Sequence, residues 1–205
     1  MKVRNVLDTR FPNTGVIVRS PAVVVPFGVT ASERHEIIPA DYVGDVGKYQ
    51  VYDISDRQGG WMRASPLAHN DYVNIQQVRL GNKVKPLIRL LKKWNYANSV
   101  GLRSFYIELR TTEYITGESV IIYKIDVLRA LKHLQSKQLA AMQDPKQISG
   151  YIYACPDTVK LSALSKLDTA VTRAQKAYDA EILGNLQDSF HYWDLLFGGS
   201  FPVYY

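Results

Sequence analysis

Cysteine is almost absent from this 205-residue chain, which has only Cys155. A single thiol cannot form an internal disulfide, so the sequence excludes a disulfide-stabilised secreted domain. No leader of charged, then apolar, then small residues precedes the first expected strand, and no apolar run is long enough to cross a membrane. We therefore expect a cytoplasmic globular protein with no membrane partner.

Motifs for metal binding and for hydrolysis are also lacking. The four histidines, His35, His69, His133 and His191, show no metal-ligand spacing with one another or with Cys155. No Ser-His-Asp or Cys-His hydrolase motif is present. Neither a zinc site nor a hydrolase of these types is expected, and Cys155 is expected to be an ordinary buried thiol.

Acidic residues are missing from one long window. Between Tyr72 and Ile107 there is no Asp or Glu, while the whole chain has a net charge of +6. Such an excess of cations favours a phosphate-bearing ligand or nucleic acid as a partner, although a charged helix face is often simply solvated. The cations in this window are Arg79, Lys83, Lys85, Arg89, Lys92, Lys93 and Arg103.

Apolar residues are plentiful, with 46% hydrophobic and 11% aromatic residues, which is enough for a packed core. Short runs rich in Val, Ile and Tyr, separated by Pro, Gly and Asp, predict strands in the first third of the chain. These runs cover residues 15–20, 22–27, 34–40 and 49–54. The predicted fold class is α+β, with a sheet in residues 1–65 and a helical domain in residues 66–205.

The helix expected from Lys83 is amphipathic and basic. Its apolar residues recur at helical spacing: Val84, Leu87, Ile88, Leu91 and Trp94. This spacing places Trp94 in the core. An alternative is a nucleic-acid-binding tract, in which aromatic residues interleave with the cations of the window: Tyr72, Trp94, Tyr96 and Phe105. Further helices are predicted at about 103–115, 125–136, 158–184 and 185–198. In the third of these the expected stripe is Leu161, Leu164, Leu167 or Asp168, Val171, Ala174, Tyr178 and Ile182.

Glu36 is a lone carboxylate in an otherwise apolar strand pattern, "RHEIIPA". A period of two places Glu36 and Ile38 on one face of the strand and His35 and Ile37 on the other. Glu36 is therefore expected to project from a sheet surface. Taken without its context, it is an edge-strand residue facing solvent.

Several segments, taken in order, resemble one enzyme family: "AVVVPF", "HEIIPA", "GGWMRASP", "KVKPLIRLLKKW", "LRSFYIEL" and "WDLLFGGSFP". Together they are similar to the carboxy-terminal part of the cyclic-oligonucleotide synthases of bacterial antiphage systems, which share a fold with oligoadenylate synthases and cyclic GMP-AMP synthase. The resemblance implies part of a DNA polymerase β-like nucleotidyltransferase sheet, followed by an oligoadenylate-synthase-like helical domain. It implies magnesium-dependent condensation of ATP or other nucleoside triphosphates into a signalling oligonucleotide.

The resemblance implies that Glu36 is the third carboxylate of a site for two magnesium ions, and so a catalytic residue and metal ligand. Two cations about 4 Å apart need several carboxylates to hold them. The family's Gly-Ser turn and Asp-x-Asp strand are missing before Glu36, and Asp53 and Asp56 are spaced to point in different directions. The chain alone is therefore expected to be inactive or to need a second chain.

Three further residues acquire nucleotide-binding roles by resemblance. Lys85 would reach a phosphate, Ser104 would hydrogen-bond the nucleotide and Phe105 would stack on a base. The structural alternative is that Lys85 is solvated, Ser104 caps a helix and Phe105 is core.

Three hypotheses follow: a fragment of an active synthase, an inactive nucleotide-binding regulator, or a basic module for nucleic acid. A half-sheet would also leave strand edges unpaired, so association through an exposed sheet edge is expected.

Overall fold

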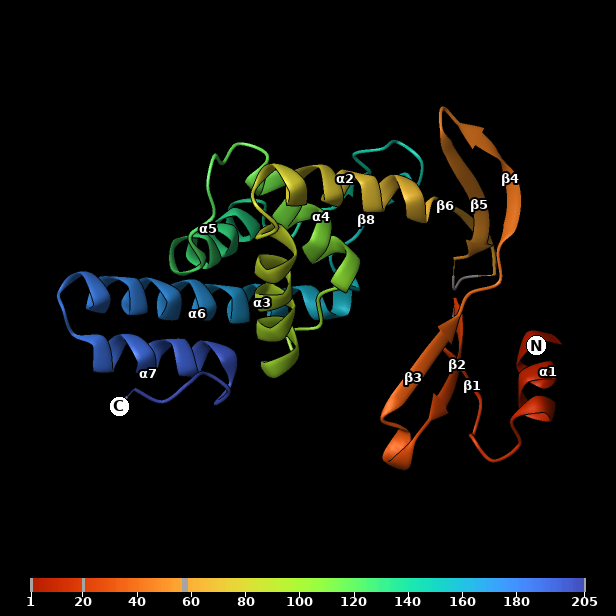
Figure 1. The fold of residues 1–205 in the computed structure, drawn as a ribbon, viewed down its shortest axis with the longest axis horizontal. Coiled ribbons are helices and arrows are strands. Elements are labelled where there is room, and N and C mark those ends of the chain that lie inside the picture. The colour runs from red at the N-terminus through yellow and green to blue at the C-terminus, as the bar shows by residue number, and fades with distance from the viewer. Residues whose placement is uncertain (1, 20, 57–58, 205) are drawn as a thin grey trace. The chain divides into compact units, whose positions relative to one another are not determined.

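The computed structural model describes residues 2–19, 21–56 and 59–204, and these form two compact units (Figure 1). The first unit contains Met1–His69 and Lys146–Gly150, and the second contains Asn70–Pro145 and Tyr151–Tyr205. The first unit thus ends at His69 rather than at residue 65, and it takes in a short segment from much later in the chain.

The first unit begins with a helix and a small antiparallel sheet. Helix α1 (Lys2–Arg10) precedes strands β1 (Ile17–Arg19), β2 (Ala22–Phe27) and β3 (Glu33–Ile37), which pair in the order β1-β2-β3. A one-turn 3-10 helix, Val29–Ala31, joins the last two strands. Strands were expected at all three places, and β2 has the bounds that were predicted.

Helix α1 was not expected from the sequence. Its apolar residues Val3 and Leu7, with Phe11 after its end, pack against buried Val23 and Val25 of β2. The apolar stripe lies among lysine, arginine and aspartate residues, and none of its residues is fully buried. Its stability therefore comes from packing on the sheet more than from its own sequence.

A second antiparallel sheet completes the first unit. Strands β4 (Asp41–Val46), β5 (Tyr49–Ser55) and β6 (Trp61–Ala64) pair in that order, and only β5 was expected. Val51 of this sheet is buried with Ala68 and Ile148. Strand β4 contains two aspartates and a glycine, which are uncommon in strands, and β6 has only four residues, so both patterns were weak.

Helices make up most of the second unit, where a short two-stranded ribbon lies between α5 and α6. The helices are α2 (Pro66–Arg79), which starts in the first unit, α3 (Val84–Ala97), α4 (Ser104–Ile115), α5 (Tyr123–Ser136), α6 (Asp157–Ile182) and α7 (Leu186–Phe197); the ribbon is β7 (Met142–Gln143) with β8 (Tyr151–Ile152). Figure 1 shows α6 and α7 lying side by side, and they are in contact. Among the described residues, no helix has both the length and the apolar character required to span a membrane.

The core of this unit confirms the stripe predicted for α3. Its buried residues are Val84, Leu87, Ile88, Leu91 and Trp94, the five that were expected. Cys155 is also buried and is a free cysteine, as expected. A helix with a wide apolar stripe and polar residues elsewhere can be recognised from spacing alone.

The stripe predicted for α6 was wrong in part. Leu161 is 82% exposed and Ile182 is 66% exposed. Apart from Leu167, the residues that α6 buries are alanines: Ala163, Ala170, Ala174 and Ala177. Leu164, Val171 and Tyr178 of the predicted stripe are partly buried and pack against the core, so the prediction was wrong only at the two ends of the stripe. Helix α2 was missed because its apolar residues are scattered, with Leu67, Ile75 and Val78 exposed.

Candidate functional site

Glu36 lies on β3, at the surface of the first sheet. It is opposite Val24 of β2, and its side chain is 53% exposed. One carboxylate oxygen accepts a hydrogen bond from the guanidinium of Arg34 at 2.6 Å. His35 packs edge-on against Phe27, with ring centroids 5.4 Å apart. The structure therefore places Glu36 on a sheet surface, as the period of two predicted, and next to a cation.

The described residues do not fit a site for two magnesium ions. Nowhere in that part of the chain do three or more His, Cys, Asp or Glu residues gather in a way that could hold a metal ion. Asp56 accepts a hydrogen bond from the N–H of Gly60 at 2.9 Å, so its carboxylate is engaged by the backbone just before β6. Glu36 beside Arg34 supplies one carboxylate, whereas two cations need several.

Part of the positive charge in the acid-free window is used inside the second unit. The guanidinium of Arg79 donates to the carbonyls of Ile115 and Glu118, at 2.8 and 2.7 Å. Lys83 donates to the carbonyl of Ile121 at 3.2 Å. These two cations satisfy carbonyl groups at and after the end of α4, where positive charge is favourable. They are therefore not available to a ligand in this structure.

The exposed arc of α3 carries the remaining charge of that helix. Lys92 is paired with Glu108 of α4 at 2.6 Å. Lys85, Arg89 and Lys93 are exposed, and among the described residues their side chains have no hydrogen-bond or ion-pair partner. They follow one another at intervals of four, so they lie on one face of the helix.

Ser104 and Phe105 begin α4. Ser104 is the first helical residue rather than the cap, and the N-cap residue, Arg103, makes no side-chain capping bond. Phe105 is 37% exposed. Ser104 is therefore not the helix cap, whereas Phe105 is partly covered, and the nucleotide-binding roles of both residues stay predictions. The first turn of α4 also contains no acidic residue, so its backbone N–H groups are favourable to an anion.

Lys85 lies at the opposite end of α3 from Ser104 and Phe105. Side-chain contacts connect Lys92 with Glu108, and Asn95 with Leu102, so the start of α4 lies beside the last turns of α3. Lys85 is ten residues before Asn95, or about 15 Å along the helix axis. A ligand that contacts both ends would have to extend along α3.

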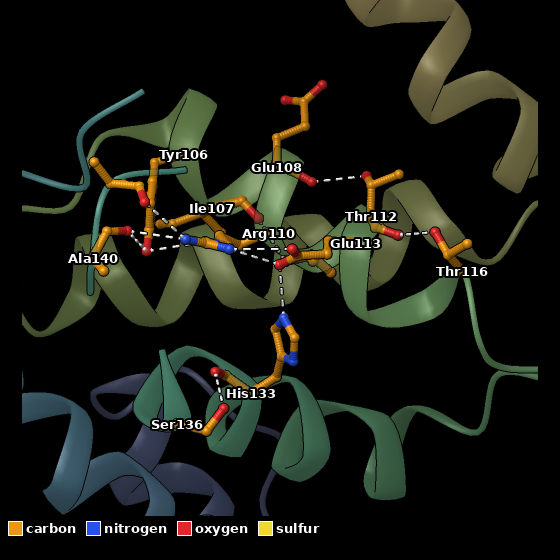
Figure 2. A network of polar contacts seen from close by, with 12 residues as sticks. Tyr106, Ile107, Glu108, Arg110, Thr112, Glu113, Thr116, His133, Ser136 and Ala140 are labelled. Atoms are coloured by element: carbon orange, nitrogen blue, oxygen red, sulfur yellow. Dashed lines mark hydrogen bonds and ion pairs between the residues drawn. The ribbon is translucent and has the colours of Figure 1, made fainter. Parts of the chain in front are cut away.

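A buried polar network in α4 was not predicted from the sequence (Figure 2). Arg110, with a side chain 7% exposed, donates to both carboxylate oxygens of Glu113 at 3.2 and 2.9 Å and to the carbonyl of Ala140 at 3.0 Å. The hydroxyl of Tyr106 donates to the same carbonyl at 2.8 Å. Glu113 also contacts Nε2 of His133 on α5 at 2.9 Å. The network ties α4 to α5 and to the segment that follows α5.

The network sets the ionisation of its members. Burial acts to raise the pKa of Glu113, but hydrogen bonds with His133 and Arg110 outweigh burial and lower that pKa. Burial also raises the pKa of Tyr106, which keeps its hydroxyl protonated and able to donate. Only the pair Arg110 and Glu113 could have been suspected from the sequence, because residues three apart are neighbours on a helix.

Comparison with known proteins gives two kinds of match, although no family model matches the sequence. A curated protein of Bacillus cereus (strain VD146), named a probable cyclic nucleotide synthase, is 25% identical over 170 residues. In fold, CdnC of E. coli MS115-1, solved with ATP, matches with a TM-score of 0.74 at 18% identity, covering 98% of this chain and 71% of CdnC. This chain has the fold of the cyclic-oligonucleotide synthases. The resemblance stated from the sequence segments is thereby confirmed, as is the α+β class.

Another synthase shows the same fold. Vibrio cholerae DncV, a cyclic AMP-GMP synthase solved with a linear pppA(3′,5′)pG intermediate, matches with a TM-score of 0.73 at 14% identity over 96% of this chain and 57% of DncV. CdnC has also been solved in a complex with HORMA-deltaN, with a TM-score of 0.73. The Bacillus match covers 82% of this chain, and the chain spans about half, 51%, of that relative's length.

Proposed function

We propose that this chain is part of a nucleotidyltransferase of the cyclic-oligonucleotide synthase type. The assembled enzyme would condense nucleoside triphosphates into a signalling oligonucleotide, with magnesium, in cytoplasmic antiphage defence. The observation that carries the proposal is the match in fold to CdnC, solved with ATP, over nearly the whole of this chain. Exposed Ser104 and Phe105, and the unpaired cations of α3, add support.

The roles proposed for the second unit concern nucleotide binding. Lys85 would neutralise a phosphate, the hydroxyl of Ser104 would hydrogen-bond the nucleotide, and the ring of Phe105 would stack on a base. We propose ATP as the first ligand to test, since CdnC has been solved with ATP.

The role proposed for Glu36 is conditional on further carboxylates. Glu36 would leave its ion pair with Arg34 and become one ligand of a metal ion only where further carboxylates from outside these residues are supplied. By itself the chain is expected to bind nucleotide without forming phosphodiester bonds. If the chain acts in this way in the cell, it is the nucleotide-binding regulator of the second hypothesis.

Binding of ATP to the full chain tests the proposal. Phe105→Ala should weaken binding by about 1–3 kcal/mol because a stacking surface is removed. Lys85→Ala should weaken it less, and the loss should shrink as salt is raised. Tyr96→Ala is the matched control, because Tyr96 is an aromatic residue of α3 that is 81% exposed and has no proposed role. Isothermal titration calorimetry at two salt concentrations would measure all four proteins.

Calorimetry with a long polynucleotide in place of ATP distinguishes the nucleic-acid hypothesis from the nucleotide site. The unpaired cations Lys85, Arg89 and Lys93 favour that hypothesis. Single nucleotides would then bind weakly and a long polynucleotide would bind strongly, with an affinity that falls steeply with salt. Equal ATP affinities for the wild-type chain, Phe105→Ala and Lys85→Ala would contradict the proposed nucleotide site.

A further inference from the structure

Asn95, in the last turn of α3, clamps the chain just before α4. Its side-chain amide nitrogen, Nδ2, donates to the carbonyl of Leu102 at 2.9 Å, and the N–H of Leu102 donates to its Oδ1 at 3.0 Å. One amide side chain thus satisfies both polar backbone groups of one residue, as a neighbouring strand would. Leu102 lies two residues before Ser104, so the clamp holds the chain just before α4 begins.

The segment 99–103 is also fixed by two other parts of the second unit. Nζ of Lys166, on α6, donates to the carbonyl of Ser99 at 2.7 Å. The N–H of Arg103 donates to the carbonyl of Ala154 at 2.7 Å. The segment is therefore attached to α3, to α6 and to the loop before α6, and it has little freedom to move separately.

Packing fixes the same segment from inside. Val100 is 1% exposed and Leu102 is 5% exposed, so both are anchored in the core. Between them, Gly101 has φ of +88°, and a Cβ there would lie 2.9 Å from Cγ1 of Val159 on α6. This position requires glycine, because it combines a left-handed backbone with close approach to a neighbouring helix.

Immediately after these anchored residues, the side chains turn to the surface. Arg103, Ser104 and Phe105 are all exposed. The backbone here is held from three sides and presents consecutive exposed side chains. It is preorganised for binding, because its conformational entropy is already lost on folding and not on binding.

We infer that Asn95 is a positioning residue for nucleotide binding: by holding Leu102 it sets the start of α4, and with it the places of Ser104 and Phe105. The inference rests on the proposed function, since these two residues are its proposed nucleotide contacts. Asn95 would not touch the nucleotide itself.

The test compares two asparagines that each make two part-buried hydrogen bonds to backbone groups. Asn95→Ala removes both bonds to Leu102. The control, Asn98→Ala, removes the bonds that Nδ2 of Asn98 donates to the carbonyls of Trp94 and Leu196, at 3.0 and 2.9 Å. Asn95→Asp is a milder variant that keeps the acceptor for the Leu102 N–H, and it serves if the alanine variant does not fold.

Two measurements on the full chain decide the inference. Hydrogen exchange without ligand should be faster at residues 102–106 in Asn95→Ala than in Asn98→Ala. ATP affinity, measured by calorimetry well below the unfolding temperature, should fall roughly 5- to 10-fold in Asn95→Ala and be unchanged in Asn98→Ala, because only the former disturbs the start of α4.

Each other result overturns the inference in a recognisable way. Unchanged exchange at 102–106 shows that Asn95 does not set the start of α4. Equal losses of affinity in the two variants show a general effect on folding. If the wild-type chain binds no ATP, the proposed nucleotide site fails first, and the role of Asn95 in binding fails with it.

Discussion

The two units of this protein differ in how completely each one buries its apolar residues. In the second unit one continuous cluster of buried residues extends from Val73 to Phe197. Among the described residues of the first unit, the two buried clusters have three residues each, and all five residues of β3 are exposed. The second unit thus has one extended core, whereas the first has small sheets with little buried apolar surface.

This difference explains why sequence reasoning succeeded in one unit and was weaker in the other. A helix that packs on several neighbours needs a wide apolar stripe, which is visible as a spacing. The two strands that were missed are β4, which contains two aspartates and a glycine, and β6, which has only four residues. Such strands leave a weak pattern.

The largest effect is expected in the core of the second unit. Leu91→Ala should lower the free energy of unfolding by about 2–5 kcal/mol, because Leu91 is fully buried on α3 and its removal leaves a cavity. Leu161→Ala makes the same substitution on α6 at a residue that is 82% exposed, and should cost less than about 0.5 kcal/mol. Urea denaturation followed by circular dichroism measures both. Similar costs for the two substitutions would mean that Leu161 is buried, as the predicted stripe had it.

A smaller effect is expected from the buried network of α4. Because the pKa of Glu113 is lowered on folding from the ordinary value of a glutamate, its stabilising contribution is present above that ordinary value and is lost as the pH falls through the lowered one. Glu113→Gln should cost about 1 kcal/mol at neutral pH, a modest figure because the carboxylate is partly exposed, and should flatten the loss of stability in acid.

The control for this prediction is Glu118→Gln. Glu118 makes one longer ion pair, 3.6 Å from Arg129, so the substitution should change the stability less. Chemical denaturation at several pH values between 3 and 7 measures both variants. An acid limb that is the same in wild type and in Glu113→Gln would contradict the role assigned to the network.

The smallest effect is expected at the edges of the first unit. Strands β1 and β3 are the outer strands of their sheet, and Val18 on β1 is 57% exposed. We expect the full chain to self-associate as its concentration rises, and Val18→Lys to weaken that association several-fold, because lysine on an edge strand opposes further pairing. Val29→Lys, at an 84% exposed residue outside the sheet, is the control. A clean monomer at all concentrations in analytical ultracentrifugation would contradict this view of the first unit.

For the candidate site, the sequence indicated residue types but not their arrangement. The period of two correctly placed Glu36 on a sheet surface, but its partner Arg34 depends on the side-chain conformations of the strand. Ser104 and Phe105 became candidates for nucleotide binding through the family resemblance. That Lys85 lies at the other end of α3 became visible only from the contacts of α3 with α4.

By itself, the sequence determined the elements whose pattern is local: strand β2, the buried stripe of α3, and the acid-free basic window. It also carried the ordered segments by which the synthase fold was recognised. Only the tertiary structure decided that Leu161 and Ile182 of α6 are exposed, that α1 packs on the first sheet, and that Arg110 joins Glu113 to the carbonyl of Ala140. The clamp of Asn95 on Leu102 belongs with these. The physical reason is that spacing along the chain reports the side of an element that is apolar, whereas close packing and buried hydrogen bonds depend on partners that only the fold brings together.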